Sequence, residues 1–222
     1  LVGFVPRAAA ALRPNVLLIL ADDLGFGDLS CLNTNSAWKT PNLDRLAREG
    51  RVFTDAHSAS SVCTPSRYAL MTGCYAWRGR LKSSVLDGYD PALLEPRRPN
   101  LARFLQSHGY ATAMVGKWHL TKDAEQNAAA DKRSWPCQRG FDRFYGILDA
   151  FTNLHQPHRL MEDNHQVRVD DYPEGYYFTD DITDRAIEMI REVKAADPAK
   201  PFFCYVAHGA VHAPLHARAD DI

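Results

Sequence analysis

Three short apolar runs, separated by segments with helical signals, constrain the fold of this chain more than any other feature. The runs occupy residues 15–21, 110–116 and 201–207. Each is too short to cross a membrane, and its continuous apolarity is typical of a strand buried on both faces of a parallel sheet. The alternation of such strands with helices predicts an α/β fold, in which a mostly parallel (mixed) central sheet is flanked by helices.

Composition places the chain among ordinary globular proteins. Its 222 residues, 45% hydrophobic and 24% charged, are enough for one large domain. The net charge of -1 provides no broad attraction to nucleic acid or to an anionic membrane, so we expect neither a nucleic-acid partner nor a membrane span. We assign residues 1–13 to an N-terminal extension or leader remnant and residues 14–222 to the domain. The cellular compartment stays open.

Helical signals fall between the apolar runs. Residues 40–50 begin with Thr-Pro and end with Gly, which predicts a helix whose apolar side packs on the sheet. A short strand is expected over residues 51–54 and an exposed insertion over residues 121–139. Thr179 is expected to cap a further helix that carries two acids in its first turn.

Polar side chains follow each apolar run: Asp22 and Asp23, then Lys117 and His119, then His212. The carboxyl ends of parallel strands form the ligand-binding edge of such sheets, so we expect these side chains to converge. Adjacent acids at the end of a buried strand are costly unless they are paired or bind a hard divalent cation. Taken alone, the acids also fit a helix cap or a turn, and the Lys–His pair fits ordinary surface groups.

A nucleophile precedes the next helical segment, in the sequence Cys-Thr-Pro-Ser-Arg. Thr64 suits a helix cap, Pro65 the first helical position, and Gly73 the helix end. Cys63 is then expected just before a helix N-terminus, where free amides and the helix dipole favour negative charge. Arg67 follows about one turn later and can point to the same place. This combination suits a substrate with a tetrahedral oxyanion, such as sulfate or phosphate.

Other interpretations of Cys63 remain at this point. A thiolate phosphatase is chemically plausible, because a cysteine at a helix N-terminus has a lowered pKa. The short gap to Arg67 and the lack of a Gly-rich loop argue against it. A buried structural cysteine is the third interpretation. The spacing of the 5 cysteines gives no zinc pattern and no compact disulfide framework.

The motif Cys-x-Pro-Ser-Arg, followed by an apolar helix and Thr-Gly, resembles that of the type I sulfatases. These are formylglycine-dependent, arylsulfatase-like members of the alkaline phosphatase superfamily. Asp22-Asp23 with the following Gly-Phe-Gly-Asp, Gly-Lys-Trp-His-Leu around Lys117, and His-Ala-Pro at His212 are similar to further motifs of the family. Val211 stands where the family commonly has proline.

The resemblance implies a cofactor, a metal and a maturation partner. A separate formylglycine-generating enzyme would oxidise Cys63 to formylglycine, whose hydrate is the nucleophile. Asp22, Asp23 and the modified residue 63 would bind calcium or magnesium. The substrate would be a sulfate ester, either a small molecule or a saccharide.

The resemblance also implies roles for the remaining site residues. Lys117 would contact the sulfate, and with Arg67 it would offset the oxyanion charge. His119 would hydrogen-bond the formylglycine hydrate. His212 would bind the sulfate and protonate the leaving oxygen.

The resemblance covers only the N-terminal part of a sulfatase. The family's later region supplies an Asp-Asn pair to the metal and another sulfate-binding lysine, and nothing in this sequence matches those positions. A truncated, non-catalytic fragment with an exposed sheet edge is therefore one alternative. A phosphonate monoester or phosphodiester hydrolase, which shares the Cys-x-Pro-Ser-Arg motif, is the other.

Overall fold

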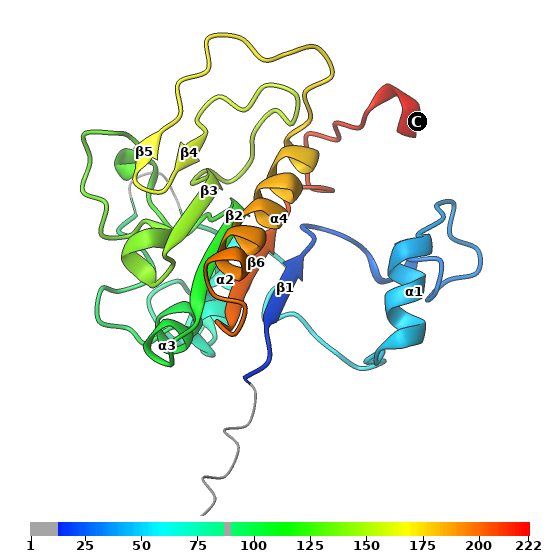
Figure 1. Ribbon diagram of the computed structural model, residues 1–222, viewed down its shortest axis with the longest axis horizontal. Coiled ribbons are helices and arrows are strands. Elements are labelled where there is room, and N and C mark those ends of the chain that lie inside the picture. Colours follow the sequence, from blue (N-terminus) through cyan, green and yellow to red (C-terminus); the bar gives the residue numbers. More distant parts are fainter. Residues whose placement is uncertain (1–12, 87–89) are drawn as a thin grey trace, which may run out of the picture.

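The computed structural model describes residues 13–86 and 90–222, and its strands form one 6-stranded sheet in the order β1-β6-β2-β3-β4-β5 (Figure 1). The strands are β1 (Val16–Leu20), β2 (Ala111–Lys117), β3 (Arg143–Ile147), β4 (Met161–Glu162), β5 (His165–Gln166) and β6 (Phe202–Ala207). Neighbouring strands from β1 to β3 are parallel, whereas β4 and β5 add antiparallel pairs. The predicted mostly parallel, mixed sheet is confirmed.

Helices cover both faces of this sheet. The α-helices are α1 (Pro41–Glu49), α2 (Cys63–Thr72), α3 (Leu101–Ser107) and α4 (Phe178–Ala196). The 3-10 helices are η1 (Phe26–Asp28), η2 (Ala76–Arg78), η3 (Asp123–Glu125), η4 (Pro136–Arg139) and η5 (Ala219–Asp221). Helix α4 lies across β2, β3 and β6, and α2 and α3 pack into the core on the other face (Figure 1).

Strand β2 separates two apolar cores, because successive side chains of a strand point to opposite faces. Met114 joins the core beneath α2 and α3, and Val115 joins the core beneath α4, both with 0% exposure. From α4, Ile182, Ala186 and Met189 recur at helical spacing and are buried in the second core. Two buried faces explain the continuous apolarity of the β2 sequence.

The start of α4 differs from the prediction. Tyr177 is the N-cap and the helix begins at Phe178, so Thr179 does not cap it. Phe178 is fully buried, and its amide donates to the Leu154 carbonyl at 2.7 Å. The N-cap of the helix therefore lies two residues before the predicted one, where a tertiary contact holds the first helical residue.

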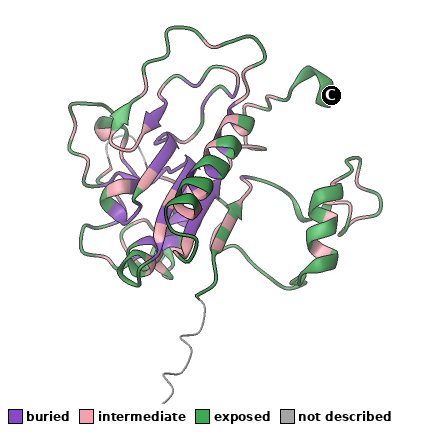
Figure 2. Ribbon diagram, in the orientation of Figure 1, coloured by how far each residue is buried: buried purple, intermediate pink, exposed green. Residues whose placement is uncertain are grey.

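The flank around β1 also departs from the prediction. Leu17 and Ile19 are 52% and 55% exposed, and the other face of β1 is only partly buried. Helix α1 lies beside β1, away from the layers of the sheet, and has no buried residue (Figures 1 and 2). Its expected packing on the sheet is wrong, and residues 51–54 form no strand.

The segment 121–139 is not the exposed insertion that its polar composition suggested. Trp135 is fully buried and its indole Nε1 donates to the Glu125 carbonyl at 2.8 Å. The indole of Trp118 donates to the Ser134 carbonyl at 3.0 Å. These bonds to backbone carbonyls let two large indoles close the core beside β2.

Gly116 allows the ends of β2 and β6 to approach closely. Its φ is +96°, and a Cβ at this position would lie 2.0 Å from the Ala207 carbonyl oxygen. Only glycine accepts both the backbone conformation and the contact. The next residue is Lys117, so this approach places Lys117 near the end of β6.

The assignment of residues 1–13 and 14–222 stays a prediction, since residues 1–12 lie outside the described part of the chain. Among the described helices, none combines the length and the apolar composition that a bilayer crossing requires.

Candidate active site

The loops that follow β1 and β6 are joined by backbone hydrogen bonds. The His208 amide donates to the Leu20 carbonyl at 2.9 Å, continuing the sheet pairing past the strand ends. The backbone of Asp22 makes two further hydrogen bonds. Its amide donates to the Ala210 carbonyl at 2.9 Å, and its carbonyl accepts from the Val211 amide at 2.8 Å. These bonds bring Asp22 and His212 to one place.

Asp22 is the centre of a buried charge cluster. Its carboxylate lies 2.5 Å from Lys117 Nζ and 3.3 Å from Arg67 Nη2. The side chains of Asp22, Lys117 and Arg67 are 8%, 1% and 2% exposed. Removing such charges from water is costly, so each depends on the others. Two cations face one carboxylate, which leaves this buried cluster with a local excess of positive charge.

Cys63 faces this cluster from the first turn of α2. Its Sγ lies 3.3 Å from Lys117 Nζ. The helix begins at Cys63 with Val62 as N-cap, so the prediction that Thr64 caps it is wrong. The Ser66 hydroxyl donates to the Val62 and Ser60 carbonyls, both at 2.8 Å, and this ties the preceding loop to the first turn. Gly73 ends the helix as predicted, with a φ of 67°.

Arg67 is held by the backbone of β2 as well as by Asp22. Its Nη1 donates to the Lys117 carbonyl at 2.7 Å. Its Nε and Nη2 are buried and make no hydrogen bond. Buried donors without partners are rare in native proteins and indicate a missing ligand or a functional role. Arg67 is thus a fixed, partly unsatisfied cation beside Cys63.

His119 is buried and neutral at physiological pH. Burial, reinforced by the charges of Lys117 and Arg67, lowers the pKa of His119 to about 3. Its Nδ1 is buried without a hydrogen-bond partner, and its backbone has a φ of 53°. Left-handed backbone at a residue other than glycine is uncommon and concentrates at functional sites. His119 can therefore act as a hydrogen-bonding group here, not as a cation.

His212 lies at the open side of the cluster, with its side chain 23% exposed. Its Nδ1 donates to the Ala213 carbonyl at 2.5 Å. Its Nε2 is 3.8 Å from Asp23 Oδ2, which is too long for a direct hydrogen bond. The Asp23 side chain is 54% exposed, so the two adjacent acids have very different surroundings.

The described residues contain one group of possible metal ligands at this site. Ligand atoms of Asp22, Cys63 and His212 lie within 4.8 Å of one another. The grouping of His212 with Asp22 and Cys63 was not predicted, and Asp23 is outside it. A hard divalent cation prefers oxygen ligands, and this set offers the Asp22 carboxylate, with the Asp23 carboxylate nearby. These carboxylates fit a hard divalent cation, with further ligands required.

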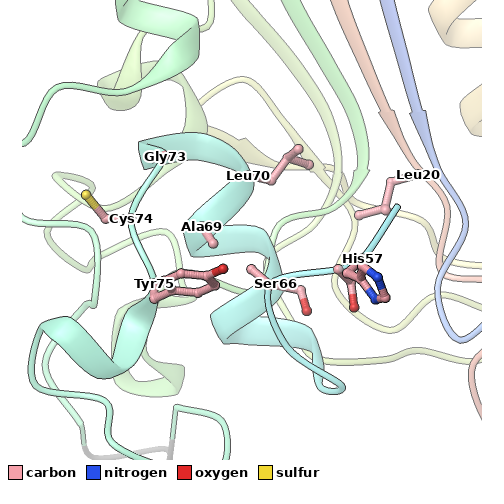
Figure 3. Close-up of a pocket in the computed structure, with 10 residues that line it drawn as sticks. Leu20, His57, Ser66, Ala69, Leu70, Gly73, Cys74 and Tyr75 are labelled. Atoms are coloured by element: carbon pink, nitrogen blue, oxygen red, sulfur yellow. The ribbon is translucent and has the colours of Figure 1, made fainter. Parts of the chain in front are cut away.

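Two adjoining cavities flank Cys63. The first, of about 210 Å³, is lined by Asp22, Asp23, Cys63 and Arg67. The second, of about 460 Å³, lies between α2 and the loop carrying His57 and is lined mainly by apolar atoms (Figure 3). Of these two cavities, the first places Cys63 beside Arg67, so the chemistry is expected there.

The sequence analysis did not predict that Tyr205 and Phe151 lie beside site residues. Burial raises the pKa of the Tyr205 hydroxyl, which the nearby Arg67 charge opposes, but its sequence context indicated only a core strand. Phe151 lies against His212, with ring centroids 6.4 Å apart. An aromatic residue shortly after a strand end was the available signal, and it is too common to be decisive.

Fold and site together define a class: an α/β protein whose sheet edge holds buried cations around a cysteine at a helix N-terminus. Proteins of the alkaline phosphatase superfamily have a similar fold. A member of it from Vibrio parahaemolyticus superposes with a TM-score of 0.56 at 19% identity, over 95% of this chain and 43% of its own.

The sulfatase family model matches residues 14–221, and the chain belongs to that family. Human arylsulfatase D is 41% identical over 164 residues, which is 71% of this chain and 27% of that protein. The crystal structure of Ps i-CgsB superposes with a TM-score of 0.81 at 28% identity, over 94% of this chain and 47% of its own. The chain therefore spans less than half the length of these relatives. Members of this family generally have a metal ion and a formylglycine residue.

Proposed function

We propose that this protein hydrolyses sulfate esters in the manner of an arylsulfatase, with formylglycine made from Cys63. One observation carries the proposal: Cys63 shares a cavity with Arg67, whose buried Nε and Nη2 lack hydrogen-bond partners, and lies 3.3 Å from Lys117 Nζ. A sulfate group bound at Cys63 would supply acceptors for these donors. Its negative charge would also offset the local excess of buried cations.

Formylglycine at position 63 would supply a hydrated aldehyde, with one hydroxyl to attack sulfur and a second to restore the aldehyde. A divalent cation, calcium or magnesium, held by Asp22, Asp23 and residue 63 would supply further positive charge. Arg67 and Lys117 are fixed before substrate arrives, by the Lys117 carbonyl and the Asp22 carboxylate. Preorganised cations of this kind stabilise charge that develops on the sulfate oxygens.

His119 and His212 would have different roles, His119 in hydrogen bonding and His212 in proton transfer. His119 is neutral, with a pKa of about 3, so its free Nδ1 can exchange a hydrogen bond with the hydrate without adding charge. His212 donates from Nδ1 to a carbonyl, which leaves Nε2 as its second ring nitrogen. With both nitrogens protonated, His212 would donate the Nε2 proton to the leaving oxygen as general acid.

The first test is the chemical state of Cys63 in protein produced with a formylglycine-generating enzyme. Peptide mapping should show a loss of about 18 Da at this residue, the thiol-to-aldehyde change. Cys63→Ala should abolish turnover of aryl sulfates. Cys74→Ala, a half-buried cysteine at the other end of α2, is the matched control and should retain it.

A panel of aryl sulfate and aryl phosphate esters then separates the hydrolase classes. Preferred turnover of sulfates supports the proposal, and preferred turnover of phosphate or phosphonate esters replaces it with the related hydrolase activity. Unmodified Cys63 together with no turnover of any ester would contradict the proposed function.

A further inference from the structure

The loop after β3 lies on the loop that carries His212. The Leu154 amide donates to His216 Nδ1 at 3.2 Å, and the rings of His155 and His216 lie 5.8 Å apart. Tyr177, at the start of α4, donates its hydroxyl to the His216 carbonyl at 2.9 Å. The far end of the His212 loop is thus anchored to neighbouring segments.

Phe151 makes the contact nearest to the reacting groups. Its ring lies against the imidazole of His212, with centroids 6.4 Å apart and an angle of 12° between the planes. This is an offset, nearly parallel arrangement within the range in which aromatic pairs attract.

The loop that carries Phe151 is anchored by neighbouring residues. Thr152 and Leu154 are 4% and 5% exposed and anchor the backbone, and Thr152 Oγ1 lies 3.2 Å from His158 Nδ1. Phe151 itself is 59% exposed, although burying a phenyl ring is favourable. The ring is therefore placed beside His212 without the usual gain from a core position.

The His212 ring is held by a hydrogen bond at Nδ1, which donates to the Ala213 carbonyl. Its Nε2 lies 3.8 Å from Asp23 Oδ2, which is too far for a direct hydrogen bond. A flat neighbour on the ring face restricts the remaining motion and so fixes the direction of Nε2.

We propose that Phe151 is a positioning residue for His212 and holds its imidazole in the orientation that protonates the leaving oxygen of the ester. The inference rests on the proposed sulfatase function. It assigns Phe151 no bond-making step: the proton passes from His212 to the departing oxygen as the S–O bond breaks.

The kinetic test compares esters that differ in their need for a proton. Alkyl or saccharide sulfates release basic alkoxides and depend on general acid catalysis, whereas p-nitrophenyl sulfate releases a stable phenolate. Phe151→Ala should lower kcat about tenfold for the alkyl or saccharide ester and less than about twofold for p-nitrophenyl sulfate. Phe151→Tyr and Phe151→Trp, which keep a flat ring, should restore the loss.

Phe104 provides a matched control on α3. It is 57% exposed and its ring lies 4.3 Å from that of His108, outside the site. Phe104→Ala should change neither ester. An equal loss of kcat for both esters in Phe151→Ala would overturn the positioning role.

Nuclear magnetic resonance separates failure of this inference from failure of the proposed function. The ring protons of His212 should shift in Phe151→Ala and recover in Phe151→Trp, and those of His108 should stay unchanged. Unchanged His212 resonances would overturn the stacking contact whatever the activity. If the wild-type protein turned over no sulfate ester, the proposed function would fail while this measurement still tested the contact.

Discussion

Strands β1 and β2 both end in residues of the candidate active site, but they are held in different ways. β2 is covered on both faces, and Met114 and Val115 are fully buried. β1 leaves Leu17 and Ile19 more than half exposed, and the neighbouring helix α1 has no buried residue.

The comparison shows that packing alone does not position the site. Lys117 is placed by the packing of β2 and by the close approach at Gly116. Asp22 instead depends on backbone bonds to the β6 loop and on its ion pairs with Lys117 and Arg67. The less packed strand is thus tied to the more packed one through the site itself.

The largest effect that tests this comparison is expected at Asp22. Asp22→Ala leaves Lys117 and Arg67 buried without their anion and should lower the free energy of unfolding by about 3–5 kcal/mol. Asp23→Ala, at an adjacent exposed acid, should change it by less than about 0.5 kcal/mol. Urea unfolding of both variants is the measurement. Equal effects would show that the ion pairs do not anchor β1.

The next largest effect compares the apolar side chains of the two strands. Met114→Ala should destabilise the protein by about 3 kcal/mol, since it removes a fully buried side chain and leaves a cavity. Ile19→Ala, on the exposed face of β1, should lower the free energy of unfolding by less than about 1 kcal/mol. A large loss for Ile19→Ala in the same unfolding experiment would mean that this face of β1 is covered in solution.

Measured over a single pH unit, the smallest effect is the pH dependence contributed by His119 at the end of β2. An unfolded histidine binds a proton below about pH 6.5, whereas folded His119 stays neutral down to a pKa of about 3. The unfolded state therefore binds more protons in this window, and stability should fall as pH falls from about 6.5 toward 3, by at most about 1.4 kcal/mol per pH unit.

His119→Gln removes this contribution while the other titrating groups remain. The stability of the wild type relative to this variant should decline with falling pH across the same window. A flat difference curve would show that His119 is not kept neutral by its surroundings.

Local sequence signals correctly predicted the strands with a continuous apolar pattern and a helix end marked by glycine. The apolar runs at residues 110–116 and 201–207 identified β2 and β6, because a strand buried on both faces needs apolar residues throughout. Gly73 ends α2, so this helix stop written in the sequence was also confirmed.

The errors arose where tertiary contacts override local pattern. Residues 40–50 have a helical pattern, and α1 forms, but the pattern does not state what the apolar side meets. Residues 121–139 read as polar, yet Trp135 is buried because backbone carbonyls accept its indole proton. Helix α2 begins at Cys63, one residue before its expected cap, because Val62 already has extended backbone.

The sequence by itself determined the family, the α/β class and the residue types of the candidate site, since these follow from motifs and short-range periodicity. Only the tertiary structure decided which of these residues are charged neighbours and how each is oriented. It separated buried Asp22 from exposed Asp23, left Nε and Nη2 of Arg67 without hydrogen-bond partners, and put Phe151 against His212. The physical reason is that burial and side-chain direction depend on contacts between segments far apart in the chain, which no local pattern encodes.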